Sequence, residues 1–234
     1  MSGAVTYRHD DSIAVITLDD GKANVLGVAM QQAINDALDN AERNEVGAVV
    51  IAGNQKVFSG GFDLKVFQSG DVDASVAMLQ GGFELSHRLL SFPKPVVMAC
   101  TGHAIAMGAF LLCSGDHRIA APGCNIQANE VAIGMVLPIS AIEIMRMRLT
   151  RAAFQRAVAL ATTFAGDAAV AAGWLDEIVE EGTVLARAQE VAGEFAATLN
   201  VTAHRASKLK ARDEALKAIR AGIDGLPTEF AGGN

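Results

Sequence analysis

Glu130 is the residue of this chain whose type and setting most clearly suit acid–base chemistry. It lies among apolar neighbours, with Ala128 on one side and residues 131–133 on the other. Burial among such neighbours disfavours the charged carboxylate and raises its pKa toward neutrality, as a general base requires. Glutamate is also a common residue of solvent-exposed loops, so this residue by itself leaves both interpretations open.

Two glycine-bearing junctions are candidates for holding a negatively charged oxygen. The first is the segment 58–64, where Gly60 and Gly61 follow an apolar run and permit a sharp turn. The second is the segment 102–116, which leads from another apolar run into an all-apolar helix near Met107. A helix start offers unpaired amides and the positive end of the helix dipole. Either turn alone is an ordinary strand-to-helix connection, but together they predict an oxyanion hole, worth about 2.7 to 4 kcal/mol per donor.

The elements that must position these groups alternate between strand and helix over the first 150 residues, as a layered α/β domain requires. Strands are expected at residues 5–9, 13–18, 48–52, 57–58, 95–100, 117–121 and 125–126. Helices are expected at residues 28–43, 73–90, 107–113 and 138–148.

Beyond Thr150 the chain becomes alanine-rich and mostly helical. Helices are expected at residues 151–161, 167–172, 184–199 and 211–221, with one short strand at 177–179. Such helices expose several apolar faces, so we expect them to dock on the core or on neighbouring subunits, and we predict a homo-oligomer. The domain division is therefore 1–150 and 151–234.

Composition and charge argue against several classes of protein. The 234 residues are 51% hydrophobic, enough for one large core with a helical appendage. The net charge of −7 argues against nucleic-acid binding, and Lys208, Lys210 and Arg212 are expected on a solvated helix face. No apolar run reaches the roughly 18 residues of a membrane span, and residues 1–10 lack a signal-peptide core, so we expect a cytoplasmic protein without a membrane partner.

Cysteines and histidines do not form a ligand pattern. Cys100, Cys113 and Cys124 are odd in number and have no Cys-x-x-Cys spacing, which favours reduced, buried thiols. The five histidines are scattered, and no glycine-rich nucleotide loop is present. We therefore expect neither a metal site nor a nucleotide cofactor.

Seven motifs in this order resemble the crotonase, or enoyl-CoA hydratase/isomerase, superfamily, from Val5 to about Gly225. Within this superfamily, the motif sequences are especially similar to those of mycobacterial-type paralogues described as probable enoyl-CoA hydratases. The motifs are Lys22–Leu26, Phe58–Lys65, Pro93–Val97, Gly102–Gly108, Cys113–Arg118, Asn129–Glu130 with Gly134, and Ala168–Val179.

The resemblance implies an enzyme of fatty-acid metabolism with a ββα-spiral core over 1–150 and a C-terminal helical trimerisation region over 151–234. It implies a homotrimer or a dimer of trimers that acts on acyl-CoA thioesters, with coenzyme A as part of the substrate and no other cofactor. By motif position, the backbone N–H groups of Phe62 and Met107 form the oxyanion hole. The substrate-binding residues are Lys22, Ala23, Asn24, Leu26, Gly60, Gly61, Phe62, Asp63, Leu64, Met107 and Phe110.

Some polar residues of these motifs have simpler structural roles. Asp63 is more simply a helix N-cap than a catalytic acid. Asp116 and Arg118 are expected to form a structural polar pair.

The carboxylates decide between the reactions of the family. Its hydratases use two glutamates, and the resemblance places Phe110 and Glu130 at those positions. A phenylalanine cannot orient water, whereas one glutamate beside an oxyanion hole is the arrangement of the family's Δ3,Δ2-enoyl-CoA isomerases. The resemblance therefore favours an isomerase in which Glu130 removes a proton from C2 of a 3-enoyl-CoA and returns it to C4.

Two alternatives remain. A hydratase would need a second acid from elsewhere, and Glu84, one helical turn from His87, is the candidate, although a solvent-facing acid is the simpler interpretation. A non-catalytic member that binds CoA esters or RNA is the other, and the acidic net charge argues against the RNA version. Dehalogenase, decarboxylase or ring-cleaving chemistry would use the same fold and oxyanion hole.

Overall fold

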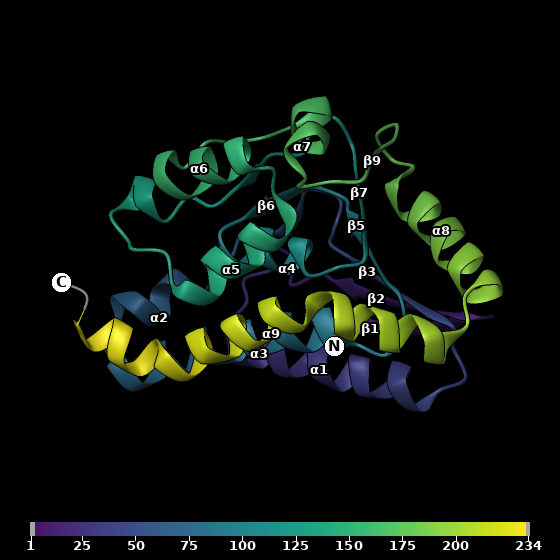
Figure 1. The fold of residues 1–234 in the computed structure, drawn as a ribbon, viewed down its shortest axis with the longest axis horizontal. Coiled ribbons are helices and arrows are strands. Elements are labelled where there is room, and N and C mark those ends of the chain that lie inside the picture. The colour runs from purple at the N-terminus through teal and green to yellow at the C-terminus, as the bar shows by residue number, and fades with distance from the viewer. Residues whose placement is uncertain (1–2, 233–234) are drawn as a thin grey trace.

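A six-stranded sheet forms the centre of the molecule, in the spatial order β1-β2-β3-β5-β7-β9 (Figure 1). The computed structural model describes residues 3–232. β1 pairs antiparallel with β2, and all other neighbours in this sheet are parallel. The strands are β1 (Val5–Asp10), β2 (Ile13–Leu18), β3 (Ala48–Ala52), β5 (Val96–Cys100), β7 (His117–Ala120) and β9 (Glu177–Ile178).

The central strands are apolar along their whole length because protein covers both of their faces. Every residue of β3 and β5 is buried, as expected for parallel strands inside an α/β protein. α8 (Val184–Thr198) packs on β2, β3 and β5, while α1 (Val28–Arg43) packs on β1 and β2.

A second, smaller sheet gives the fold its spiral form. Its three parallel strands are β4 (Val57–Ser59), β6 (His103–Ile105) and β8 (Ile126–Gln127). Each follows a strand of the large sheet along the chain, so that β3-β4, β5-β6 and β7-β8 form three successive pairs, each followed by a helix. This repeated ββα unit confirms the expected α/β class with a ββα-spiral core.

Most predicted elements are right to within a few residues, and the differences lie in short or long segments. The remaining helices are α2 (Leu64–Gln68), α3 (Val72–Ser91), α4 (Met107–Cys113), the 3-10 helix η1 (Val131–Ile133), α5 (Ile139–Arg148), α6 (Arg151–Leu160), α7 (Gly166–Ala172) and α9 (Val201–Gly232). β6 and η1 were not predicted, and α2 was expected only as a helix capped by Asp63, without bounds, because three to five residues carry no measurable periodicity. The helix expected at 211–221 is the middle of α9, which is longer at both ends.

Part of the predicted C-terminal region belongs to the main core. β9 pairs with β7, and α8 lies against the sheet. α9 lies alongside α3 and α5 (Figure 1). The outer ends of the predicted division, residues 1–2 and 233–234, lie outside the described residues. In the described part of the chain, no helix has both the length and the apolar character needed to cross a membrane.

A buried ion cluster fastens α9 to the core and corrects two predictions. Asp116 does not pair with Arg118: its two carboxylate oxygens accept from Lys208 Nζ at 2.7 Å and from an Arg212 Nη atom at 2.8 Å. Arg118 pairs instead with Asp176, at 2.8 Å. Lys208 and Arg212 therefore face inward rather than lying on a solvated face, because each finds a carboxylate that is distant in sequence.

Candidate active site

A cavity of about 150 Å³ lies where α2, α3, α4 and the segment 129–138 meet. Among the described residues that line it, Asn129 and Glu130 have the only polar side chains, and the other twelve are glycine or apolar. Phe62, Phe110 and Gly60 of the predicted site all lie on its wall.

The two glycine-bearing turns touch one another at this cavity. Gly61 has a φ of +91°, and a Cβ atom there would lie 2.9 Å from Ala106 Cβ and 3.3 Å from the Met107 nitrogen. Ala106, which immediately precedes α4, itself has a φ of 51°. Only glycine at position 61 lets the turn approach the start of α4 so closely.

The backbone amides of Phe62 and Met107 have no acceptor in the described chain, and Phe62 lines the cavity whereas Met107 is fully buried behind it. Phe62 follows Gly61, and Met107 is the first residue of α4. Two such amides from touching turns have the form of an oxyanion hole.

The predicted coenzyme-binding loop is bonded directly to the first turn. Gly60 N donates to Ala23 O at 2.8 Å, and Leu26 N donates to Gly61 O at 2.7 Å. Asn24 is fully buried with a φ of 48°, and its Nδ2 donates to Leu18 O at 2.9 Å. The side chains of Asn24 and Leu26 are therefore internal supports of this loop, whereas Lys22 and Ala23 are exposed.

Asp63 and Leu64 continue the first turn. Asp63 accepts from Lys65 N at 3.0 Å, which confirms its interpretation as the N-cap of α2. Leu64 is 53% exposed at the edge of the cavity.

A row of four phenylalanines forms one wall of the cavity, in the order Phe67, Phe62, Phe83 and Phe110. The first two pairs meet edge to face, with ring centroids 6.3 and 6.0 Å apart, and Phe83 stacks on Phe110 at 6.2 Å. Sequence reasoning did not find Phe67 or Phe83. The apolar face of the helix at 73–90 was the available signal, but it does not say which surface the helix covers.

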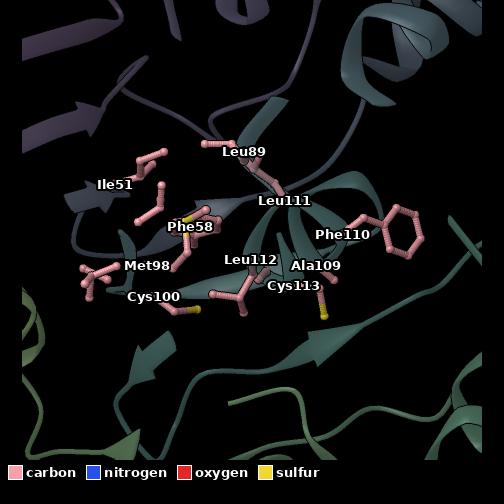
Figure 2. Close-up of a cluster of buried hydrophobic side chains, with 14 of the residues drawn as sticks. Ile51, Phe58, Leu89, Met98, Cys100, Ala109, Phe110, Leu111, Leu112 and Cys113 are labelled. Carbon is pink, nitrogen blue, oxygen red and sulfur yellow. The ribbon is translucent and has the colours of Figure 1, made fainter. Parts of the chain in front are cut away.

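Phe110 leaves α4 on a different side from the neighbouring core residues. Figure 2 shows Leu112 directed toward Met98 and Phe58, while the Phe110 ring points away from that cluster. Its ring is fully buried and reaches the cavity.

Glu130 is the single titratable side chain among the described residues that line the cavity. It is 7% exposed, directly precedes η1, and has an Oε2 atom with no hydrogen-bond partner in the described chain. Gly134, with a φ of +80°, ends η1. Burial raises the pKa of the Glu130 carboxyl to about 7, where a carboxylate accepts a proton efficiently at neutral pH.

Glu84, the candidate second acid on α3, forms an ion pair with α9 and does not line the cavity. Its carboxylate forms a two-point ion pair with Arg220 of α9, and the hydrogen bond from Arg220 lowers its pKa. Its side chain is 46% exposed, and it does not line the cavity. Glu84 is therefore not the second acid of this site.

Comparison with known proteins shows the family of this chain. The enoyl-CoA hydratase/isomerase family model matches residues 8–224. The structure is similar to that of an enoyl-CoA hydratase from Mycobacterium marinum, with 64% identity, a TM-score of 0.95 and coverage of 97% of this chain and 100% of that chain. It is also similar to two structures of one Mycobacterium tuberculosis protein. One is named an enoyl-CoA isomerase, with 63% identity, a TM-score of 0.95 and coverage of 98% and 100%; the other is named a probable enoyl-CoA hydratase, with 64% identity, a TM-score of 0.96 and coverage of 97% and 96%.

A curated relative, a probable enoyl-CoA hydratase from Bacillus subtilis, is 32% identical over 57% of this chain, and the match spans only 52% of that relative. The family model, in contrast, covers nearly the whole chain. The chain therefore belongs to the enoyl-CoA hydratase/isomerase family and is an enzyme of the crotonase superfamily.

Proposed function

We propose that this enzyme converts a 3-enoyl-CoA into a 2-enoyl-CoA. The observation that carries the proposal is the pairing of one buried carboxyl, Glu130, with a phenylalanine, Phe110, on the wall of an otherwise apolar cavity. Moving a double bond requires one group that takes a proton and gives it back. It requires no bound water.

The reaction begins when the Glu130 carboxylate removes a proton from C2 of the thioester. The negative charge spreads over a dienolate whose oxygen accepts hydrogen bonds from the Phe62 and Met107 amides. The protonated Glu130 then returns the proton to C4, and the double bond lies between C2 and C3. A base with a pKa of about 7 suits both halves of this transfer.

The apolar wall supports the same reaction. With Phe83 and Phe110 stacked on the wall of the cavity, the reacting carbons lie in a surrounding of low polarity, which strengthens the contact between the oxyanion and its two donors. Exposed Lys22 and Ala23, together with the turn at 60–64, are the proposed contacts of the coenzyme A portion. No further cofactor takes part in this scheme.

We also propose that the enzyme is a homotrimer or a dimer of trimers in the cytoplasm, with the C-terminal helices at the contacts between subunits. Leu160 of α6 and Leu199 after α8 are 70% and 40% exposed. Apolar side chains at such positions are suited to contacts between subunits.

Hydration of a 2-enoyl-CoA is the second candidate, because the similar Mycobacterium marinum structure is named a hydratase. A hydratase would need a second acid, and Glu84, the glutamate of α3, is paired with Arg220 instead.

The two reactions are separated by offering the purified enzyme 3-hexenoyl-CoA and 2-hexenoyl-CoA in parallel. We expect isomerisation to be faster than hydration by at least about tenfold in kcat/KM, since Phe110 takes no part in holding water. Hydration that is as fast as isomerisation would contradict the proposal.

A further inference from the structure

The side-chain oxygen Oδ1 of half-buried Asn129 is shielded from solvent and accepts no hydrogen bond in the described chain. Leaving a buried polar atom unpaired costs roughly 1–3 kcal/mol, so such atoms are uncommon and call for a reason. The neighbouring Glu130 Oε2 is unpaired as well.

Several other buried or half-buried side-chain amides of the described chain form hydrogen bonds. Gln127, two residues earlier, donates from Nε2 to Ala161 O at 2.7 Å. Gln31 donates to Leu26 O at 2.8 Å, and Asn24 is bonded on both sides of its amide. Asn129 differs from them because it lies on the cavity wall, where a ligand can supply the missing partner.

Two side chains of the cavity wall can hold a hydroxyl group by hydrogen bonds. A water molecule enclosed in a protein needs two to four polar partners. Apart from the two amides assigned to the oxyanion, the described lining offers polar side chains only at Asn129 and Glu130, which are adjacent in sequence. A water or hydroxyl oxygen would therefore lie between these two side chains.

We propose that Asn129 holds a hydroxyl oxygen, either of water or of a 3-hydroxyacyl chain, beside Glu130 and so determines how much hydration accompanies isomerisation. The inference rests on the proposed use of Glu130 as the base. It assigns to Asn129 the contact that Phe110 cannot make.

The chemical step balances without an additional reagent. The water oxygen forms a bond to C3 of a 2-enoyl-CoA while Glu130 takes one of its protons, and the other O–H donates to Asn129 Oδ1. The electron pair of the C2–C3 double bond moves toward the thioester oxygen, which accepts from the Phe62 and Met107 amides. Glu130 then delivers its proton to C2, which gives a 3-hydroxyacyl-CoA.

Asn129→Leu tests the inference, because leucine has a similar size and cannot form hydrogen bonds. The matched control is Asn125→Leu, at an exposed position outside the cavity. For each enzyme we would measure isomerisation of 3-hexenoyl-CoA and hydration of 2-hexenoyl-CoA, with incorporation of oxygen-18 from labelled water, and dehydration of 3-hydroxyhexanoyl-CoA.

We expect slow hydration by the wild-type enzyme that falls about tenfold or more in Asn129→Leu, with isomerisation changed less than about threefold. Asn125→Leu should leave both rates unchanged. Unchanged hydration in Asn129→Leu, an equal fall in both reactions, or a wild-type enzyme with no hydration would each overturn the inference. Absence of isomerisation in the wild type would instead contradict the proposed function, because the effect of Asn129→Leu on hydration is measured separately.

Discussion

Phe83 of α3 stacks on Phe110 of α4 with ring centroids 6.2 Å apart and planes inclined by 25°. The two residues are distant in sequence, and both line the cavity that Glu130 also lines. Because both rings are fully buried, the position at which the resemblance predicts the second glutamate of a hydratase is here part of the hydrophobic core.

Phe110→Ala should lower the free energy of unfolding by about 3–5 kcal/mol, since it removes a buried ring and leaves a void beside Phe83. Urea denaturation followed by circular dichroism measures this change. Phe195→Ala is a control, because that ring is only partly buried and should cost less. A loss below about 1 kcal/mol in Phe110→Ala would show that the ring is not packed as described.

Gly61→Ala should lower kcat by about a hundredfold, because a Cβ atom would meet Ala106 Cβ and Ile105 O at 2.9 Å and push the two oxyanion amides apart. Steady-state kinetics with 3-hexenoyl-CoA provide the measurement. Gly70→Ala is the matched control: its φ is +73°, but a Cβ there meets no atom within 4 Å. Equal activity in both variants would contradict the assigned contact between the turns.

The pKa of Glu130 gives a prediction for stability as well as for rate. Isomerisation should rise with pH through about 7 as the carboxyl ionises and becomes a base. Burial raises this pKa in the folded state from an ordinary 4.5, so the folded protein binds the Glu130 proton more tightly than the unfolded chain does. The contribution of Glu130 to the free energy of unfolding is therefore greatest below about pH 4.5 and is lost as pH rises through 7.

Glu130→Gln should therefore be more stable than the wild type at pH 8, by about 3 kcal/mol, and the difference should disappear near pH 4. Thermal unfolding of both proteins at several pH values measures it. A difference that does not vary with pH would contradict the buried, unpaired state of the carboxyl.

Asp116→Asn should destabilise the protein by about 3–5 kcal/mol, because it leaves Lys208 and Arg212 buried without a carboxylate. Burial by itself would raise the pKa of Asp116, but the two cations outweigh it and hold the pKa below its usual range. The stabilisation should thus persist at neutral pH and be lost only in strong acid.

Hydrogen exchange should show faster opening of the first turns of α9 in Asp116→Asn. The control is Asp213→Asn, which removes an exposed ion pair with Lys217 on the same helix. It should change stability by less than about 1 kcal/mol. Similar effects of the two substitutions would argue against the buried ion cluster.

Local patterns predicted most of the elements, and the misses arose from contacts between distant residues. Asp63 could be assigned as an N-cap from its place before a helix. The partners of Asp116 could not, because Lys208 and Arg212 lie about ninety residues away and their helix pattern does not reveal what they face. Glu130 could be selected from its motif, which is local in sequence. Phe83 and Phe67 could not be assigned to the cavity wall from sequence, because that wall forms only where α2, α3 and α4 meet.

The most direct test of the account is the isomerisation rate of Glu130→Gln, measured together with its affinity for an acyl-CoA by titration calorimetry. Glutamine keeps the size and removes the base. We expect turnover of 3-hexenoyl-CoA to fall at least about a hundredfold, while the dissociation constant changes less than about threefold. Unchanged turnover would contradict the assignment of Glu130 as the group that moves the proton.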